Sequence, residues 1–213
     1  MIARLLRGLG WGVLLLLALF VVAYAGFVLT TGAFPAPLRP SFQVHHVAIA
    51  AHIAGGMVAL ALAPFQLLPW LRHRRIAVHR WLGRIAMLGM LIGGLGGLAM
   101  AAVSYGGLAS HLGFAAMALA WLATATLGYC SIRARQVAAH RRWMVRNVAI
   151  TLAAVTLRLW LPVLLSTHLP FDTAYPIVAW MCWLPNLLVA EAVVRLSARP
   201  RTQTPVRPGT AVS

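Results

Sequence analysis

The sequence predicts an all-α integral membrane protein built as a bundle of six helices. Of its 213 residues, 62% are hydrophobic and only 9% are charged, whereas a soluble domain carries about 25% charge. Several apolar runs have roughly the 20 residues that span a bilayer as a helix, so the lipid bilayer is the first expected partner. The predicted helices cover residues 10–32, 46–71, 78–103, 108–131, 140–166 and 174–196, within one transmembrane domain at 1–196.

The two ends of the chain differ sharply in hydrophobicity. The first helix contains the tripeptide Ala23, Tyr24 and Ala25, which resembles a signal-peptidase site, but its apolar run continues to Leu29. A retained membrane anchor is therefore predicted, with a cleaved signal peptide as the alternative. Residues 197–213 are rich in Arg, Thr and Pro. Such a segment has too little apolar surface to bury, so a disordered basic tail on the cytoplasmic side is predicted.

The distribution of basic residues predicts the topology. All 18 are arginines, and the net charge is +16. In a soluble protein this charge would favour nucleic acid, but here the arginines lie between apolar runs, so no nucleic acid partner is expected. Arginine accumulates on the cytoplasmic side of membranes, which places both termini there, in a bacterial inner membrane. All the arginines except Arg39 and Arg158 fall in alternate segments: Arg4, Arg7, Arg72, Arg74, Arg75, Arg80, Arg84, Arg133, Arg135, Arg141, Arg142, Arg146, Arg195, Arg199, Arg201 and Arg207.

A helical hairpin is predicted to occur twice in the chain. In each copy a histidine, His52 or His111, stands at the outer end of a helix. An arginine-rich turn follows, and the next helix begins with His-Arg, at His79 or His140. Both copies enter the membrane from the same side, so the predicted repeat of helices two and three in helices four and five is parallel rather than inverted.

The four repeated histidines suggest a cofactor. Neutral imidazoles that project between the helices of a bundle are suitable axial ligands for haem iron. His52 and His111 lie at the predicted outer surface, and His79 and His140 at the predicted inner surface. Two such pairs would hold two b-type haems, one near each surface, so that electrons cross the bilayer.

The surroundings of the first histidine favour a flat ligand. Gly55 and Gly56 follow His52 by three and four residues, so they lie on the same helix face and would leave room for a porphyrin. His45 or His46 is an alternative outer ligand. A second interpretation needs no haem, because histidine at a membrane interface is commonly an amphipathic group that reaches towards water.

Arg158 is predicted to lie inside the fifth helix, where an unpaired charge is costly and usually has a partner. It follows His140 by roughly five helical turns, so the two would share a face that looks into the bundle. In the haem interpretation Arg158 pairs with a propionate. The alternatives are Asp172, helix-end carbonyls or a lipid phosphate.

Acidic residues are almost absent, and this excludes several kinds of chemistry. The chain contains only Asp172 and Glu191, which leaves no paired-carboxylate catalytic site. A proton-coupled transporter would need carboxylates within its membrane helices. Glu191 precedes Arg195 by four residues, a spacing that predicts an ion pair on one helix face. The sequence therefore predicts no catalytic residue and assigns no enzyme activity.

Short motifs along residues 45–165 carry a family resemblance. They are His52-x-x-Gly55, Ala63-Pro64-Phe65-Gln66, His79-Arg80-x-x-Gly83-Arg84, Gly113-Phe114, Trp121, His140-Arg141-x-Trp143-Met144 and Arg158. This pattern resembles a family of bacterial membrane proteins, the domain of unknown function DUF2306, which implies no particular activity. The layout of the histidines is also similar to that of di-haem transmembrane b-type cytochromes, which include ascorbate-dependent ferric reductases. That similarity implies that His52 pairs with His111 and His79 with His140.

Two functions are consistent with these observations. The first is a b-type transmembrane electron-transfer protein with bis-histidine sites, which would exchange electrons with a redox or membrane protein partner. The second is a cofactor-free membrane protein, either a scaffold or subunit for a partner or a carrier of a small molecule.

Overall fold

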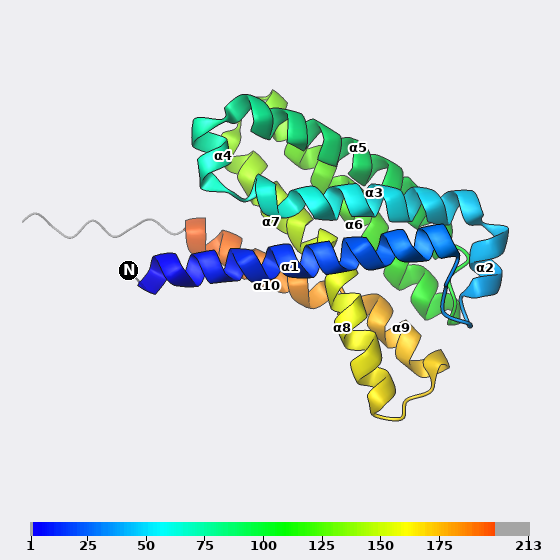
Figure 1. Cartoon of the computed structure of the whole chain (residues 1–213). Coiled ribbons are helices and arrows are strands. Elements are labelled where there is room, and N and C mark those ends of the chain that lie inside the picture. The colour runs from blue at the N-terminus through cyan, green and yellow to red at the C-terminus, as the bar shows by residue number, and fades with distance from the viewer. Residues whose placement is uncertain (1, 199–213) are drawn as a thin grey trace, which may run out of the picture.

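The computed structural model describes residues 2–198, and within this range every element of regular structure is helical, as predicted (Figure 1). The helices are α1 (Ile2–Thr31), α2 (Arg39–Val44), α3 (His46–Gln66), α4 (Pro69–Arg74), α5 (Ile76–Ala101), α6 (Gly107–Arg133), α7 (Val137–Thr151), α8 (Ala153–Ser166), α9 (Phe171–Met181) and α10 (Leu184–Ala198). The predicted tail lies outside the described residues from position 199 onward.

Six segments are long and apolar enough to cross a membrane, which confirms a multi-pass membrane protein. These segments are Gly8–Thr31, His46–Gln66, Ile76–Ala101, Gly107–Arg133, Val137–Ser166 and Phe171–Ala198. Many of their large apolar side chains are exposed, Leu9 by 68% and Leu188 by 70% among them. An exposed apolar surface of this extent is stable in lipid rather than in water.

Three predicted helices are interrupted. The second predicted helix, 46–71, ends at Gln66, and Pro69 begins the separate α4, because proline is favoured in the first turn of a new helix. The sixth breaks between α9 and α10, where Pro185 stands in the first turn of α10. The fifth breaks at Leu152, between α7 and α8.

Threonines on both sides of Leu152 account for the break in the fifth span. The hydroxyl of Thr151 donates to the Asn147 carbonyl at 2.9 Å, and that of Thr156 donates to the Leu152 carbonyl at 3.1 Å. Such bonds to the preceding turn bend helices. As a result α8 turns away from α7 and runs beside α9 (Figure 1). The prediction that Arg158 and His140 share one straight helix face is therefore wrong.

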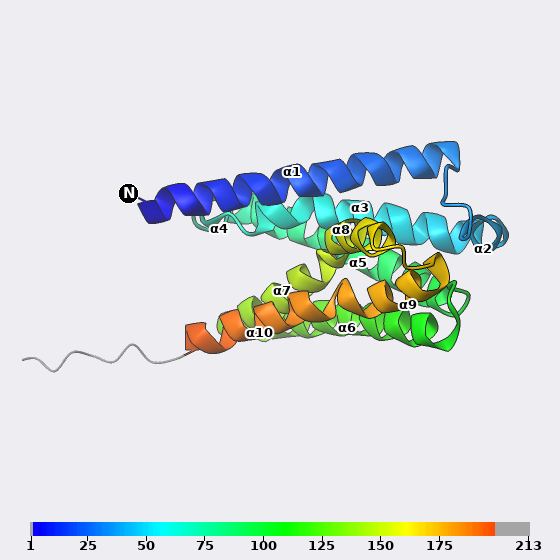
Figure 2. The same ribbon diagram turned by 90° about the horizontal axis from the view of Figure 1, so that it is seen from below.

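The six spans cross the molecule in alternating directions. Figure 2 shows the N-terminal end of α1, the C-terminal end of α10 and the short α4 at one end of the bundle, and α2 at the other. Both described chain ends thus lie at one end of the bundle. The neighbouring pairs are α3 with α5, α5 with α6 and α6 with α7, while α1 packs on α3. Two successive hairpins, α3–α5 and α6–α7, therefore form the centre of the fold, and their common origin stays a prediction.

The two central hairpins are held together differently. In α3–α5 a Cβ added to Gly55 would lie 2.4 Å from the backbone nitrogen of Gly93, so the two backbones are in contact. In α6–α7 the fully buried Asn147 amide donates to the Trp121 carbonyl and to the Thr124 hydroxyl, each at 3.0 Å. The Trp121 indole donates to the Thr151 hydroxyl at 2.9 Å.

Candidate ligand-binding site

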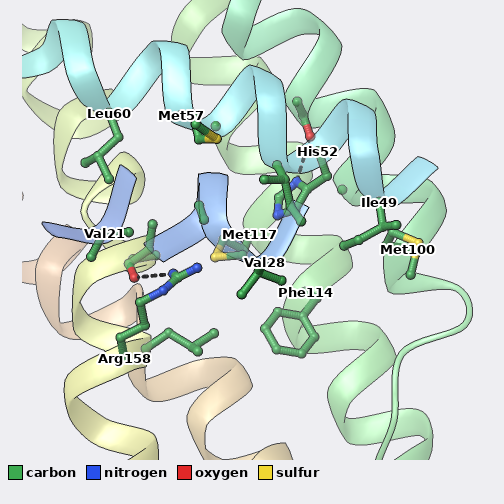
Figure 3. A pocket seen from close by; sticks show the side chains of 18 of the residues that line it. Val21, Val28, Ile49, His52, Met57, Leu60, Met100, Phe114, Met117 and Arg158 are labelled. Carbon is green, nitrogen blue, oxygen red and sulfur yellow. Dashed lines mark hydrogen bonds between the residues drawn. The ribbon is translucent and has the colours of Figure 1, made fainter. Parts of the chain in front are cut away.

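A cavity of about 530 Å³ opens between α1, α3, α5, α6 and α8 (Figure 3). Most of its lining is aliphatic, aromatic or thioether, including Val28, Leu60 and Met117. Arg158 from α8 and His52 from α3 are the two basic side chains on this lining, and both point into the same space in Figure 3. The walls therefore suit an apolar molecule that carries a polar group.

Arg158 lies within the membrane-spanning part of the fold. One of its terminal nitrogens donates to the Ala154 carbonyl at 2.7 Å, and the guanidinium stands 5.2 Å from the centre of the Tyr24 ring. Its Nε is enclosed and has no hydrogen-bond partner among the described residues. The acceptor is thus a carbonyl in the first turn of its own helix rather than one at a helix end, and it satisfies only part of the group.

Asp172 is not the partner of Arg158, which corrects one of the sequence alternatives. Its carboxylate accepts a hydrogen bond from the Tyr105 hydroxyl instead. The second carboxylate, that of Glu191, pairs with Arg195 at 2.9 Å as predicted, and also with Arg146 at 2.6 Å, which was not predicted. A long-range pair such as Arg146–Glu191 leaves no signal in the sequence spacing.

His52 is oriented by α5. Its Nδ1 lies 2.8 Å from the Gly93 carbonyl oxygen. A carbonyl only accepts, so Nδ1 carries the proton and, in the neutral ring, Nε2 keeps its lone pair. Gly97 makes room for the ring, because a Cβ there would lie 2.7 Å from Nδ1. Of the two glycines predicted to clear space on the helix of His52 itself, Gly56 lines the cavity, whereas Gly55 is packed against α5.

The other three histidines lie apart from the cavity lining. His111 uses Nε2 to contact the Ser104 carbonyl at 2.8 Å, and His140 uses Nδ1 to contact the Gly128 carbonyl at 2.9 Å. His140, Arg72 and Arg80 are the basic groups whose charges act on His79. The structure thus places His52 and Arg158 on one cavity, and His79 and His140 near the starts of α5 and α7. His111 is not part of the cavity lining. No cluster of three or more His, Cys, Asp or Glu side chains suited to a metal ion occurs within residues 2–198.

Sequence reasoning missed the contribution of α1 to the site. Tyr24, Ala25 and Val28 line the cavity, and the Tyr24 ring faces the guanidinium of Arg158. The available signal was a tyrosine in the middle of an otherwise apolar run, since an aromatic ring is a favourable neighbour for a cation within a membrane. The first span is therefore part of the site as well as an anchor.

Comparison with known proteins extends the family resemblance. The model of a family described as "Predicted membrane protein (DUF2306)" matches residues 49–194, which is more than half of the chain. No curated protein and no solved structure matches the sequence. The match covers α5, α6, α7, α8 and α9 and most of α3 and α10, and thus includes His52 and Arg158.

Proposed function

We propose that this chain, which belongs to the DUF2306 family of membrane proteins, binds an amphiphilic molecule that carries a carboxylate group within the membrane. Pockets of 300–1,000 Å³ with mostly apolar walls and a few polar groups are typical small-molecule sites, and the cavity of about 530 Å³ has these properties. This is the small-molecule form of the cofactor-free interpretation.

The observation that carries the proposal is the incomplete bonding of Arg158. A guanidinium has five N–H donors, and within the described residues only one hydrogen bond, to the Ala154 carbonyl, is made by this group. Both side-chain carboxylates of the chain are engaged elsewhere. A carboxylate supplied by the ligand would accept two parallel hydrogen bonds from the guanidinium, while the apolar body of the ligand packs beside Val28 and Met117.

The test compares a carboxylate with its uncharged ester. Dansyl-undecanoic acid and its methyl ester are titrated into the full-length protein in amphipol, and binding is followed by dansyl emission. We expect the wild type to bind the acid about tenfold more tightly than the ester, because a hydrogen bond to a charged group contributes about 1.5–3 kcal/mol. Arg158→Gln should remove this preference without changing the affinity for the ester.

The matched control is Arg133→Gln, since Arg133 is exposed, lies on α6 and bonds the Tyr129 hydroxyl rather than lining the cavity. It should keep the preference for the acid. Equal affinity of the wild type for acid and ester would refute the proposal. A preference lost equally in both variants would show that net charge, rather than Arg158, attracts the probe.

Haem b is a second candidate ligand, and the bonding of His52 favours it. A ligating histidine commonly donates its other N–H to a backbone carbonyl, which fixes the ring, and His52 does so through Gly93. Nε2 of His52 would hold the iron and Arg158 a propionate. Bound there, haem would supply one-electron transfer. The bond of His111 to Ser104 favours a site built on His52 over one built on the pair.

A dithionite-reduced minus oxidised spectrum of the purified protein tests this candidate. The haem proposal requires Soret and alpha bands. The absorbance of the haem at His52 should be lost in His52→Ala and kept in His111→Ala. A second haem between His79 and His140 would lose its half of the absorbance in His140→Ala. Absence of bands in protein from haem-replete cells excludes haem and leaves the carboxylate proposal to the dansyl experiment.

We further propose that the end of the bundle with both chain ends faces the cytoplasm, in a bacterial inner membrane. Most arginines of the described residues lie at that end, in or near α4, the starts of α5 and α7 and the end of α10, and cytoplasmic loops carry the excess of arginine. A reporter fused after Ser213 should be active in the cytoplasm. Activity in the periplasm would overturn the orientation.

A further inference from the structure

Basic groups from three helices gather at the end of the bundle that holds both chain ends. They are Arg72 of α4, His79 and Arg80 of α5, and His140 and Arg141 of α7. The charge of Arg141 acts on Arg72, and those of Arg72, Arg80 and His140 act on His79. We call this cluster the basic corner. It brings together the two His-Arg pairs that are far apart in the sequence.

Two nitrogens of the basic corner are enclosed and unpartnered. Nε of Arg72 and Nδ1 of His79 have no hydrogen-bond partner within the described part of the chain. Burial, followed by repulsion from Arg141, lowers the pKa of the Arg72 guanidinium below its usual value. Arginines that only orient a membrane protein can extend into water. These two nitrogens are instead covered by the protein, while the rest of each side chain is half-buried.

The protein has no carboxylate to place in the basic corner. Only two residues of the chain are acidic. Asp172 bonds Tyr105, which precedes α6 at the opposite end of the bundle, and Glu191 is shared by Arg146 and Arg195. Basic groups that gather without a carboxylate among them repel one another. An anion that offsets this charge would therefore come from outside the described fold.

The depth of the basic corner indicates the chemistry of that anion. Trp81 and Trp143 belong to the same helix starts, and Arg84 and Arg146 each stand 5.0 Å from the centre of one of these rings. Tryptophans of this kind mark the headgroup level of a bilayer, where phosphate is the common anion. Two guanidiniums and an imidazole offer several donors to the oxygens of one phosphate group.

We propose that Arg72, His79 and Arg141 form a binding site for a phosphate group, either the headgroup of an anionic lipid or a free phosphate. The site is independent of the cavity beside Arg158. A bound phosphate would link α4 to the starts of α5 and α7, and so would join the two hairpins at this end of the fold.

Native mass spectrometry of the full-length protein in detergent tests the site, with dioleoylphosphatidylglycerol as the probe. Arg72→Gln should weaken retention of this lipid about tenfold. Arg133→Gln, which removes the same charge from an exposed arginine bonded to Tyr129, should change it less than twofold. Arg141→Gln provides a second variant, should Arg72→Gln fail to elute as a folded protein.

Competition by inorganic phosphate then distinguishes the two sources. Release of the lipid by millimolar phosphate supports a site that accepts free phosphate groups. Loss of lipid binding in Arg72→Gln without competition supports a lipid headgroup. Equal losses in Arg72→Gln and Arg133→Gln would show a general effect of charge and overturn the proposal. So would the absence of binding by both phosphatidylglycerol and inorganic phosphate.

Discussion

The two central hairpins have the same topology but different helix contacts. In α3–α5 the interface between the two helices is formed by backbone atoms, because Gly55 of α3 faces Gly89 and Gly93 of α5. We call this interface the glycine seam. In α6–α7 the interface is formed by side-chain hydrogen bonds centred on Asn147 and Trp121, and we call it the polar seam. Apolar side chains gain little by leaving lipid for a helix interface, so close backbone packing and polar bonds are the two available sources of association.

This difference explains why histidines that match in the sequence lie in different surroundings. On α3 the glycine-lined face of α5 leaves space at Gly97, so the ring of His52 enters the seam and reaches the cavity. On α6 the ring of His111 bonds Ser104, in the connection just before its own helix. A repeat read from the ends of the helices therefore does not predict equivalent sites, because the contacts between the helices decide where each ring can go.

The strongest test of the glycine seam is Gly55→Ala. The new Cβ would lie 2.4 Å from both the Gly89 carbonyl oxygen and the Gly93 nitrogen, and backbone atoms cannot move aside without separating α3 from α5. We expect a loss of about 2–3 kcal/mol, in the upper range for overpacking. For a chain of this size the apparent melting temperature in detergent should fall by roughly 5–10 °C.

The adjacent Gly56→Ala is the control for this substitution. Nothing lies within 4 Å of a Cβ at Gly56, and alanine has the higher helix propensity by about 1 kcal/mol. Its melting temperature should be equal to or slightly above that of the wild type. A similar loss in both variants would show that glycine itself, rather than the seam, is what this segment requires.

A substitution in the polar seam should cost less stability than one in the glycine seam, and Asn147→Leu tests this expectation. This change removes two hydrogen bonds to α6 and keeps the branched shape of the side chain, with a moderate gain in volume. It also removes an enclosed amide oxygen that has no partner among the described residues, which offsets part of the loss. Hydrogen bonds between helices within membranes average about 0.6 kcal/mol and reach about 1.7 kcal/mol. We therefore expect Asn147→Leu to lower the free energy of unfolding by about 1 kcal/mol, which is less than the effect of Gly55→Ala.

Ser131→Ala is the control for the polar seam, because the Ser131 hydroxyl bonds only the Leu127 carbonyl of its own helix. It should melt within about 1 °C of the wild type, since a surface change of this kind usually alters stability by less than about 0.5 kcal/mol. If Asn147→Leu melted lower than Gly55→Ala, the ranking of the two seams would be reversed.

The sequence predicted the features that depend on position along the chain alone. Six spans follow from the lengths of the apolar runs, and the Glu191–Arg195 pair follows from a spacing of four residues. Features that depend on which helix faces meet were missed. Leu152 ends α7 without a proline nearby to mark the break, and Tyr24 reaches Arg158 across more than a hundred residues of chain.

The candidate site shows the same division. The sequence singled out His52 through the repeated histidines at helix ends, and Arg158 as a charge within an apolar run. The structure brings both to one cavity. It could not assign the space beside His52 to Gly97 of α5, since that assignment requires the register between two helices. The ligand itself, and any haem, stays a prediction for the dansyl and spectroscopic experiments.

The smallest expected effect concerns the connection between the two hairpins. Tyr105, between α5 and α6, donates a hydrogen bond to the Asp172 carboxylate of α9, and this bond is the main reason why the pKa of the tyrosine is raised above its usual value of about 10. A phenol whose pKa is raised on folding contributes stability that is complete below pH 10, the unfolded value, and is lost as the pH rises through the folded value. The melting temperature of the wild type should therefore fall above pH 10 by an amount that Tyr105→Phe does not share.

Tyr129→Phe is the matched control, because the Tyr129 hydroxyl accepts a hydrogen bond from Arg133 and does not contact a carboxylate. It should keep the alkaline loss of the wild type. An identical alkaline profile for Tyr105→Phe and the wild type would show that the bond to Asp172 does not hold the two hairpins to α9.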